Sequence, residues 1–140
     1  MGAEFSYREC RLEEAANLLA LWRKAEATVT VTDTVEDIQR VISHSAAMVL
    51  VAEQDGHIVC SVIATFDGWR GNLYRLAVDP DCRRQGLARK LVDEANNRLA
   101  SMGVKRITAL VEKDHPEAVG FWNAQGYQHD QTIVRYVRNL

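Results

Sequence analysis

The chain has 140 residues, with 17 basic and 19 acidic side chains and a formal net charge of -2. No excess of positive charge is present to attract a phosphate backbone, so we expect no nucleic-acid partner. A chain of this length buries enough apolar surface to fold without disulfides or metal, and we expect one domain over residues 1–140. Three widely spaced cysteines exclude a disulfide framework and favour a reducing cytoplasm. No apolar run reaches the roughly 20 residues of a membrane span, so no membrane partner is expected either.

The first half of the sequence predicts one strand, two helices and an antiparallel meander. Apolar residues at helical spacing follow the first short strand, and Thr34 with Asp37 three positions later approximates a capping box for a second helix. Two β-branched runs are then separated by Gln54-Asp55-Gly56, a strong hairpin signal, and a further turn at 67–71 leads to a third strand. The expected elements are a strand at 4–8, helices at 11–27 and 34–45, and strands at 47–53, 57–66 and 72–78.

The second half predicts alternating helices and strands. A long helix over 87–102 is stopped by Gly103, and a short helix over 117–125 is stopped by Gly126. Alternation predicts strands at 106–112 and 132–138, and Pro80 and Pro116 fall where helices begin. Because a strand, a helix and a strand follow one another at 72–112, these two strands should be parallel. The sequence therefore predicts an α/β (α+β) fold with a mixed sheet and the order β-α-α-β-β-β-α-β-α-β-β.

The segment 76–91 carries the clearest chemical signal. A strand runs into a short turn, and a helix opens at Gly86, whose missing side chain lets an anion reach the backbone amides. Those first-turn amides are unpaired within the helix and carry the positive end of its dipole, so they suit a phosphate group. Cations at the N-terminus of a helix oppose its dipole unless an anionic ligand lies between them. The alternative to an anion-binding site is a helix that starts at a glycine and has a solvated basic face. The cations concerned are Arg83, Arg84, Arg89 and Lys90.

The same segment resembles the fingerprint of the GNAT superfamily of acetyl-CoA-dependent N-acyltransferases. That fingerprint begins with Gln or Arg, has Gly three residues later, and has Gly or Ala two residues after the Gly. Here Arg83, Gly86 and Ala88 hold these positions. The lead-in strand matches through Leu76, Val78 and Pro80, and a second motif matches through Ala118, Phe121, Gly126 and Tyr127. The resemblance covers the whole chain and is greatest to the small bacterial YpeA-type members. It implies that the fourth and fifth strands splay around the cofactor.

The resemblance implies an N-acetyltransferase that uses acetyl-CoA as cosubstrate and no metal. The acetyl group would pass directly, in a ternary complex, to a primary amine of a small molecule, an amino acid derivative or a peptide. The backbone amide of Val78 would stabilise the oxyanion of the tetrahedral intermediate. The cofactor would lie against Leu76, Ala77, Val78, Arg83, Arg84, Gln85, Gly86, Leu87, Ala88, Arg89, His115, Ala118 and Trp122.

The sequence departs from the family pattern at the positions expected to move protons. Trp122 stands where the family has its general-acid Tyr, and an indole N–H donates a hydrogen bond but does not release a proton near neutral pH. Trp122 is otherwise a core aromatic, and Tyr127 lies too far along the chain to be an obvious substitute. His115 stands where the family often has an Asn that contacts the pantetheine; it is expected to contact the cofactor, to titrate as an acid or base, or to cap a helix.

No general base is evident. Asn72 replaces the catalytic Glu of histone-type relatives, and the nearby carboxylates of Asp67, Glu112 and Asp114 are as easily explained by turns and strand ends. A water relay is the alternative. The remaining histidines have no metal-ligand spacing.

Family logic places acceptor recognition on the first two helices, the connection 28–34 and the turn around Trp69. The candidate side chains are Trp22, Trp69, Arg70 and Arg75. Two other functions stay open: a non-catalytic acyl-CoA-binding regulatory module, and a nucleic-acid-binding domain that uses the cations of 83–90. A homodimer is expected from family habit alone.

Overall fold

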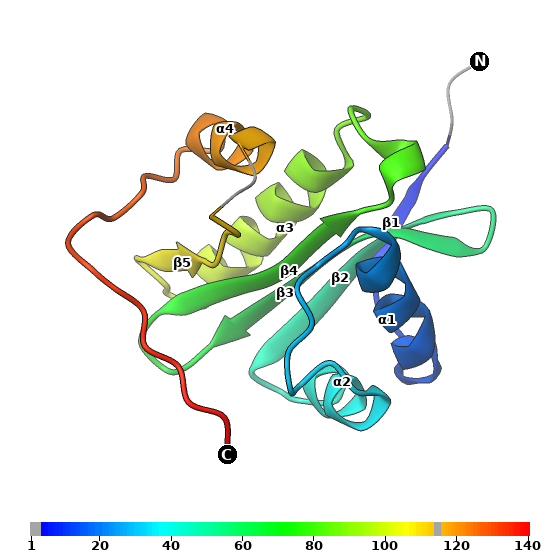
Figure 1. The fold of residues 1–140 in the computed structure, drawn as a ribbon, viewed down its shortest axis with the longest axis horizontal. Coiled ribbons are helices and arrows are strands. Elements are labelled where there is room, and N and C mark those ends of the chain that lie inside the picture. Colours follow the sequence, from blue (N-terminus) through cyan, green and yellow to red (C-terminus); the bar gives the residue numbers. More distant parts are fainter. Residues whose placement is uncertain (1–3, 114–115) are drawn as a thin grey trace. The chain divides into compact units, whose positions relative to one another are not determined.

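A computed structural model describes residues 4–113 and 116–140, and the chain forms two compact units, Met1–Leu110 and Val111–Leu140. The larger unit contains a five-stranded sheet in the order β1-β2-β3-β4-β5 (Figure 1). Neighbouring strands are antiparallel except for β4 and β5, which are parallel as the sequence predicts. The strands are β1 Ser6–Glu9, β2 Ala47–Gln54, β3 His57–Phe66, β4 Gly71–Val78 and β5 Ile107–Ala109.

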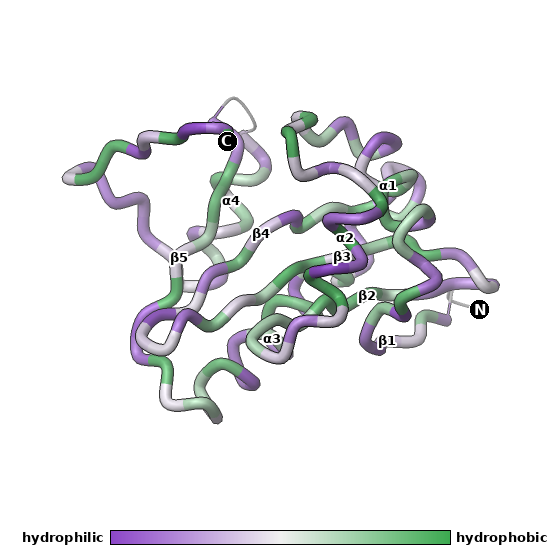
Figure 2. Tube along the Cα trace, turned by 90° about the horizontal axis from the view of Figure 1, so that it is seen from below, coloured by the Kyte–Doolittle hydropathy of each residue, from purple (hydrophilic) through white to green (hydrophobic). Residues whose placement is uncertain are grey.

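Helices cover both faces of this sheet. The 3-10 turn η1 (Leu12–Glu14) leads into α1 (Ala15–Lys24), α2 spans Val35–Ile42, and α3 spans Leu87–Ser101. Figure 2 shows α1 on one side of the sheet and α3 on the other. The predicted cap of α2 is confirmed, because the Thr34 hydroxyl accepts a hydrogen bond from the Asp37 amide at 3.1 Å.

Alternation along the strands divides the core between the two faces. On the α1 and α2 face, Leu18, Trp22 and Ile38 pack against Val49 and Val51 of β2. The intervening strand residues are also buried, and α3 contributes its own buried residues, so the central strands are apolar on both sides as expected for a covered sheet. The buried residues of α3 are Leu87, Leu91, Val92, Ala95 and Leu99.

One extra residue interrupts the pairing of β3 with β4. Ser61 pairs with Ala77 and Ile63 with Tyr74, so two steps along β3 face three steps along β4. Arg75 takes up the extra residue with a left-handed φ of 54°. Its carbonyl accepts a hydrogen bond from the Ser61 hydroxyl at 2.8 Å, and the same hydroxyl accepts one from the Trp22 indole at 3.0 Å. A buried side chain thus replaces the strand hydrogen bonds that the bulge removes.

The smaller unit is built on α4 (Pro116–Ala124). The Trp122 ring meets Phe121 and Tyr127 edge-on, with centroids 5.3 Å and 4.9 Å away. Gly126, with φ 85°, ends the helix and turns the chain back, so that the Tyr127 amide donates to the Trp122 carbonyl at 3.0 Å.

Two sequence predictions about the last third of the chain are wrong. The expected strand at 106–112 pairs only over Ile107–Ala109, and the closing strand at 132–138 is not formed in the described residues. Apolar residues of the latter occur as two adjacent pairs, Ile133-Val134 and Tyr136-Val137, so the segment lacks a strictly alternating face, and their side chains are exposed. Elsewhere the strand boundaries agree to within two residues. No helix of residues 4–113 or 116–140 has the length and apolarity to cross a membrane.

Replacing Ser61 by Ala should destabilise the protein, because the buried Trp22 N–H and Arg75 carbonyl then lose their partner. We expect a loss of about 1–3 kcal/mol in the free energy of unfolding, measured by urea denaturation. Ser101→Ala is the matched control, since its hydroxyl donates to the Asn97 carbonyl at an exposed helix end, and it should cost at most about 0.5 kcal/mol. Equal effects of the two substitutions would contradict a structural role for the buried hydroxyl.

Candidate functional site

The outer edge of β4 is open beside Val78. β5 pairs with β4 only at Gly71–Leu73, and the Leu110 amide then donates to the Leu73 carbonyl at 3.2 Å. Beyond this point no strand of the described residues pairs with the outer edge of β4. The Asp79 amide donates to Val59 of β3 at 2.8 Å. Because peptide groups of successive residues point to opposite edges of a strand, those of Val78 face the open edge.

The chain then forms a loop that leads from β4 into α3. η2 (Pro80–Cys82) is capped by the Asp79 carboxylate, which accepts the Asp81 amide at 2.9 Å. Arg83 is extended, Arg84 and Gly86 are left-handed with φ of 63° and 77°, and α3 begins at Leu87. The first helical hydrogen bond joins the Lys90 amide to the Gly86 carbonyl at 3.1 Å, so the preceding amides have no helical partner. Alternation of left-handed and ordinary conformations makes successive amides converge into an anion-binding concavity.

No atom of the described residues fills the space at Gly86. A Cβ built there meets no atom within 4 Å, and a side chain would be strained at this φ. Arg83 and Arg84 are exposed, and neither has an acidic partner in the described part of the chain. The loop therefore presents open amides and two unneutralised cations together.

The next two cations of the predicted cluster have partners. Arg89 lies 3.9 Å from Asp93 one turn along α3, and the Lys90 ammonium lies 4.6 Å from the centre of the Tyr7 ring on β1. Of the four cations predicted to form a cluster over 83–90, Arg83 and Arg84 are therefore the two without a partner among the described residues.

Lys24 of α1 anchors the start of this loop. Its ammonium donates to Asp79 at 2.9 Å and to Asp81 at 3.1 Å. Burial acts to raise the pKa of the Asp79 carboxyl, but the Lys24 ammonium and the Asp81 amide outweigh it and hold that pKa below its ordinary value. Sequence reasoning missed this contact, because Lys24 and Asp79 are 55 residues apart and no local pattern connects them.

The four predicted acceptor-recognising residues form two separate pairs: the Arg75 guanidinium lies 5.2 Å from the centre of the Trp22 ring, and the Arg70 guanidinium lies 4.0 Å from the centre of the Trp69 ring. Trp22 is buried and donates its indole N–H to Ser61, and Arg75 is held by the Asp33 carboxylate at 2.6 Å and the Thr28 carbonyl at 3.0 Å. Trp69 and Arg70 lie in the β3–β4 turn, at the end of β4 opposite Val78. Trp69 and Arg70 are therefore not part of the cluster that Trp22 and Arg75 form with the connection 28–34, and acceptor recognition by these residues stays a prediction.

Two of the carboxylate and amide candidates have structural partners. Asp67 accepts the Trp69 and Arg70 amides at 2.9 Å and 2.7 Å, which lowers the pKa of its carboxyl, as expected of a turn residue. Asn72 pairs with Thr108 across β4 and β5. Asp114 and His115 lie outside the described residues.

In the smaller unit, Ala118 is half-buried on α4 and Trp122 is a core residue. Contrary to the sequence-based expectation, Tyr127 lies against Trp122, because Gly126 reverses the chain. Within the residues that the structure describes, no three potential ligands gather that could hold a metal ion.

Comparison with known proteins gives a family match. Residues 12–127 match the model of the acetyltransferase (GNAT) family. This span covers the open edge of β4, the loop at 83–88 and the second motif on α4.

Solved structures share the fold at low sequence identity. A PaiA N-acetyltransferase from Thermoplasma acidophilum in complex with coenzyme A has 15% identity and a TM-score of 0.83, with 93% of each chain covered. A predicted acetyltransferase from Clostridium acetobutylicum with acetyl-CoA has 14% identity and a TM-score of 0.79, with 96% of each chain covered. The aminoglycoside 6'-N-acetyltransferase AAC(6')-Ih from Acinetobacter baumannii has 16% identity and a TM-score of 0.78, covering 98% of this chain and 99% of that one.

Proposed function

The chain belongs to the GNAT family of acetyltransferases, and we propose that it transfers an acetyl group from acetyl-CoA directly to a primary amine of a small molecule, an amino acid derivative or a peptide. The observation that carries this proposal is the loop after β4, in which first-turn amides without a helical partner and two exposed cations without acidic partners in the described residues adjoin an open position at Gly86. The family match spans residues of both compact units, which supports the proposal of a single domain over residues 1–140. The three free cysteines support a cytoplasmic location, which we propose as well.

The pyrophosphate of the cofactor fits this loop. Its negative charge would be met by the amides from Arg84 to Ala88, by the positive end of the α3 dipole and by the side chains of Arg83, Arg84 and Arg89. The pantetheine arm would follow the open edge of β4 beside Leu76, Ala77 and Val78, whose outer hydrogen-bonding groups have no strand partner in the described residues. Leu87 is buried at the helix start and Gln85 is exposed in the loop. From the second motif, His115, Ala118 and Trp122 complete the proposed contacts.

The reaction needs one group that stabilises the oxyanion, one that takes the proton of the amine and one that assists the leaving sulfur. The neutral amine attacks the thioester carbonyl, a C–N bond forms, the carbonyl oxygen becomes an oxyanion, and the C–S bond then breaks to release the thiolate of CoA while the amine loses a proton. The Val78 amide faces the open edge and would donate to the oxyanion. The proton of the amine would leave through water, because Asp67 is held in a turn and Asn72 has no basic group.

Departure of the thiolate is the step for which this chain lacks the residue expected from the family pattern, because Trp122 stands at the position of the general-acid Tyr. Trp122 donates a hydrogen bond but no proton, and its side chain is buried between two aromatic rings. The Tyr127 ring, with its phenol, lies 4.9 Å from Trp122 between centroids. A thiolate leaves without an acid, so we propose a slow but real transferase rather than a non-catalytic acyl-CoA-binding module.

Acetyl-CoA should stabilise the folded protein, and Gly86→Glu should abolish this effect. At a ligand concentration of 100 times Kd the stabilisation is about 2.7 kcal/mol, or about 5–11 °C in melting temperature. Glutamate at position 86 places a negative charge where the pyrophosphate is proposed to lie and strains a residue at φ 77°. Thermal melting with and without acetyl-CoA measures both effects.

Gly68→Glu is the matched control for the backbone strain that a glutamate at positive φ introduces. Gly68 also has a positive φ, 93°, and open space around its Cβ position, but it lies in the β3–β4 turn at the other end of β4. Its variant should retain the full shift. Loss of the shift in both variants, or in neither, would contradict the assignment of the loop.

Trp122→Tyr should raise kcat, because a phenol at this position can protonate the departing sulfur. Since a thiolate already leaves unaided, we expect about tenfold, below the 10²–10⁴ typical of general acids. Release of CoA thiol is followed with a panel of primary amines containing an aminoglycoside, spermidine and an alanine-terminated peptide. Trp122→Phe is the control for altered packing. An equal rise in both variants, or none in Trp122→Tyr, would show that the missing acid does not limit turnover.

A further inference from the structure

A cluster of three charged side chains joins the end of α1 to the start of the loop after β4. Lys24 is the last residue of α1, and its ammonium donates to Asp79 Oδ2 at 2.9 Å and to Asp81 Oδ2 at 3.1 Å. Asp79 directly follows Val78, whose amide is the proposed oxyanion donor. Along the chain, the cluster therefore lies between the residue proposed to stabilise the oxyanion and those proposed to hold the pyrophosphate.

Asp79 fixes the direction in which the chain leaves β4. Its amide donates to the Val59 carbonyl of β3 at 2.8 Å, and its carbonyl accepts the Cys82 amide at 2.8 Å. Its carboxylate accepts the Asp81 amide through Oδ1 at 2.9 Å and the Lys24 ammonium through Oδ2. Because both carboxylate oxygens and both backbone groups have partners, this buried residue is held in one orientation. The direction of η2 relative to β4 follows from that orientation.

The cluster also sets the charge at the start of the loop. It contains two carboxylates and one ammonium, so it carries one net negative charge, and loss of the ammonium would leave two. Burial acts to raise the pKa of the Asp79 carboxyl, but Lys24 and the Asp81 amide hold that pKa below its ordinary value, so the carboxylate is charged at neutral pH. Without Lys24, this carboxylate would repel the phosphate groups of a cofactor bound at the loop.

We propose that Lys24 is a positioning residue for the cofactor, whose ammonium acts through Asp79 to keep the loop after β4 in the conformation that binds the pyrophosphate of coenzyme A. The inference rests on the proposed transferase function and assigns Lys24 control over the affinity for its cosubstrate. The apparent affinity of a ligand falls in proportion to the fraction of the protein that is competent to bind it. Loss of the ammonium lowers that fraction.

A merely structural role for Lys24 would give a different pattern. The side chains of Lys24 and Asp81 are 51% and 82% exposed, and exposed ion pairs add little to global stability. When Lys24 is replaced, η2 keeps its cap from Asp79 and its hydrogen bond to β3. We therefore expect the melting temperature of ligand-free Lys24→Gln to fall by less than about 3 °C. The effect on the affinity for coenzyme A should be larger than this change in stability explains.

Isothermal titration calorimetry of the full chain with coenzyme A tests the proposal. Lys24→Gln should raise Kd about fivefold, because the Asp79 carboxylate loses its charged partner. Lys24→Arg should bind within about twofold of the unaltered chain, since a guanidinium restores the charge and the hydrogen bonds to a carboxylate. Asp81→Asn should also stay within about twofold, because it removes only the more exposed of the two ion pairs.

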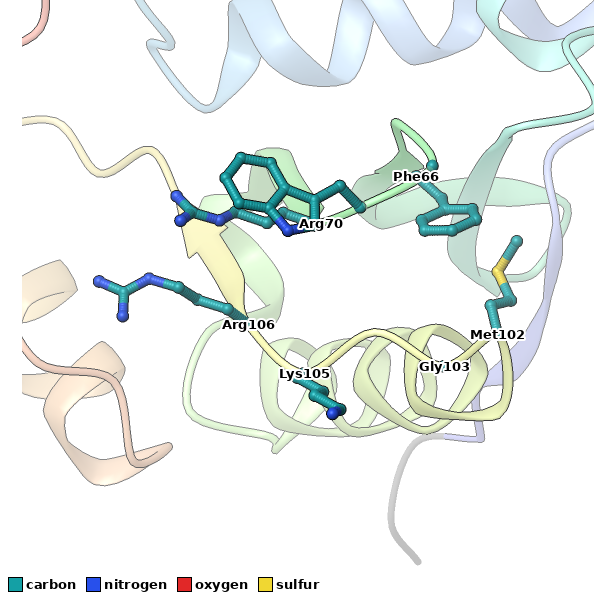
Figure 3. Close-up of a pocket in the computed structure, with 8 residues that line it drawn as sticks. Phe66, Arg70, Met102, Gly103, Lys105 and Arg106 are labelled. Atoms are coloured by element: carbon teal, nitrogen blue, oxygen red, sulfur yellow. The ribbon is translucent and has the colours of Figure 1, made fainter.

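Two further variants remove a positive charge outside the cluster. Arg23→Gln changes the preceding residue of α1, which has no acidic partner among the described residues. Lys105→Gln changes a residue that lines a groove of about 510 Å³ between the β3–β4 turn and the chain from α3 to β5 (Figure 3). The 15 residues of α3, which span about 22 Å, separate this groove from Gly86. Both variants should keep Kd within about twofold, since only screened long-range attraction is lost.

Amide hydrogen exchange of the ligand-free protein gives a readout that does not involve the cofactor. The amides of Asp81 and Cys82 donate to the carboxylate and the carbonyl of Asp79. In Lys24→Gln these two amides should exchange about fivefold faster, because η2 opens more often once Asp79 is less firmly held. Amides in the middle of α3 should exchange as in the unaltered chain.

The outcomes separate this inference from the proposed function. If the unaltered chain binds coenzyme A and Lys24→Gln binds it equally well, the positioning role is wrong and the transferase function stands. Equal weakening in Lys24→Gln and Arg23→Gln would likewise overturn the positioning role, because it would reduce the effect to general attraction between charges. Weakening that Lys24→Arg does not restore would overturn it too. Absence of coenzyme A binding by the unaltered chain would overturn the proposed function, and the positioning role with it.

Discussion

The extra residue in β4 is the constraint on which the candidate site depends. Arg75 adopts a left-handed conformation, and its carbonyl is turned toward the Ser61 hydroxyl rather than into a regular ladder. A non-glycine residue at positive φ is uncommon and costs free energy, so surrounding contacts must hold it there. Here the Trp22 indole, the Asp33 carboxylate and the Thr28 carbonyl supply those contacts. The bulge fixes which peptide groups beyond it face β3 and which face the open edge at Val78.

Two ion pairs connect this bulge and the following loop to the helical layer. Arg75 reaches the α1–α2 connection through Asp33, and Lys24 at the end of α1 holds the start of the loop through Asp79. The side chains of Arg75 and Asp33 are 19% and 7% exposed, so this pair is better shielded from water than ordinary surface pairs, whereas Lys24 is 51% exposed in its pair with Asp79. Removing one partner of a shielded pair leaves a charge without compensation. Helix α1 and the α1–α2 connection thus hold the bulge and the start of the loop after β4, in addition to the cover that the helices give the sheet.

The sequence was sufficient to predict the elements whose signals are local. Strands β2 to β4, helix α3 and the cap at Thr34 follow from alternation, helical spacing and side-chain chemistry within a few residues, and the loop motif is identified by its resemblance to the family fingerprint. Contacts between distant residues were not predictable: Lys24 with Asp79, Arg75 with Asp33, and Trp22 with Ser61. The strand expected at 132–138 failed because apolar content was mistaken for strict alternation. The contact of Tyr127 with Trp122 does not follow from their separation in the sequence, because it depends on the chain reversal at Gly126.

The central claim is that backbone amides of the loop after β4 hold the pyrophosphate of the cofactor. The most direct measurement is a titration of the isotopically labelled protein with coenzyme A, followed residue by residue through the amide signals in NMR spectra. The account predicts that the amides of Arg84 to Ala88 and of Val78 shift first and most, because these amides have no helical or strand partner and are the proposed ligand donors. Shifts confined to the opposite end of α3, at Lys105 and the Trp69 turn, would contradict it.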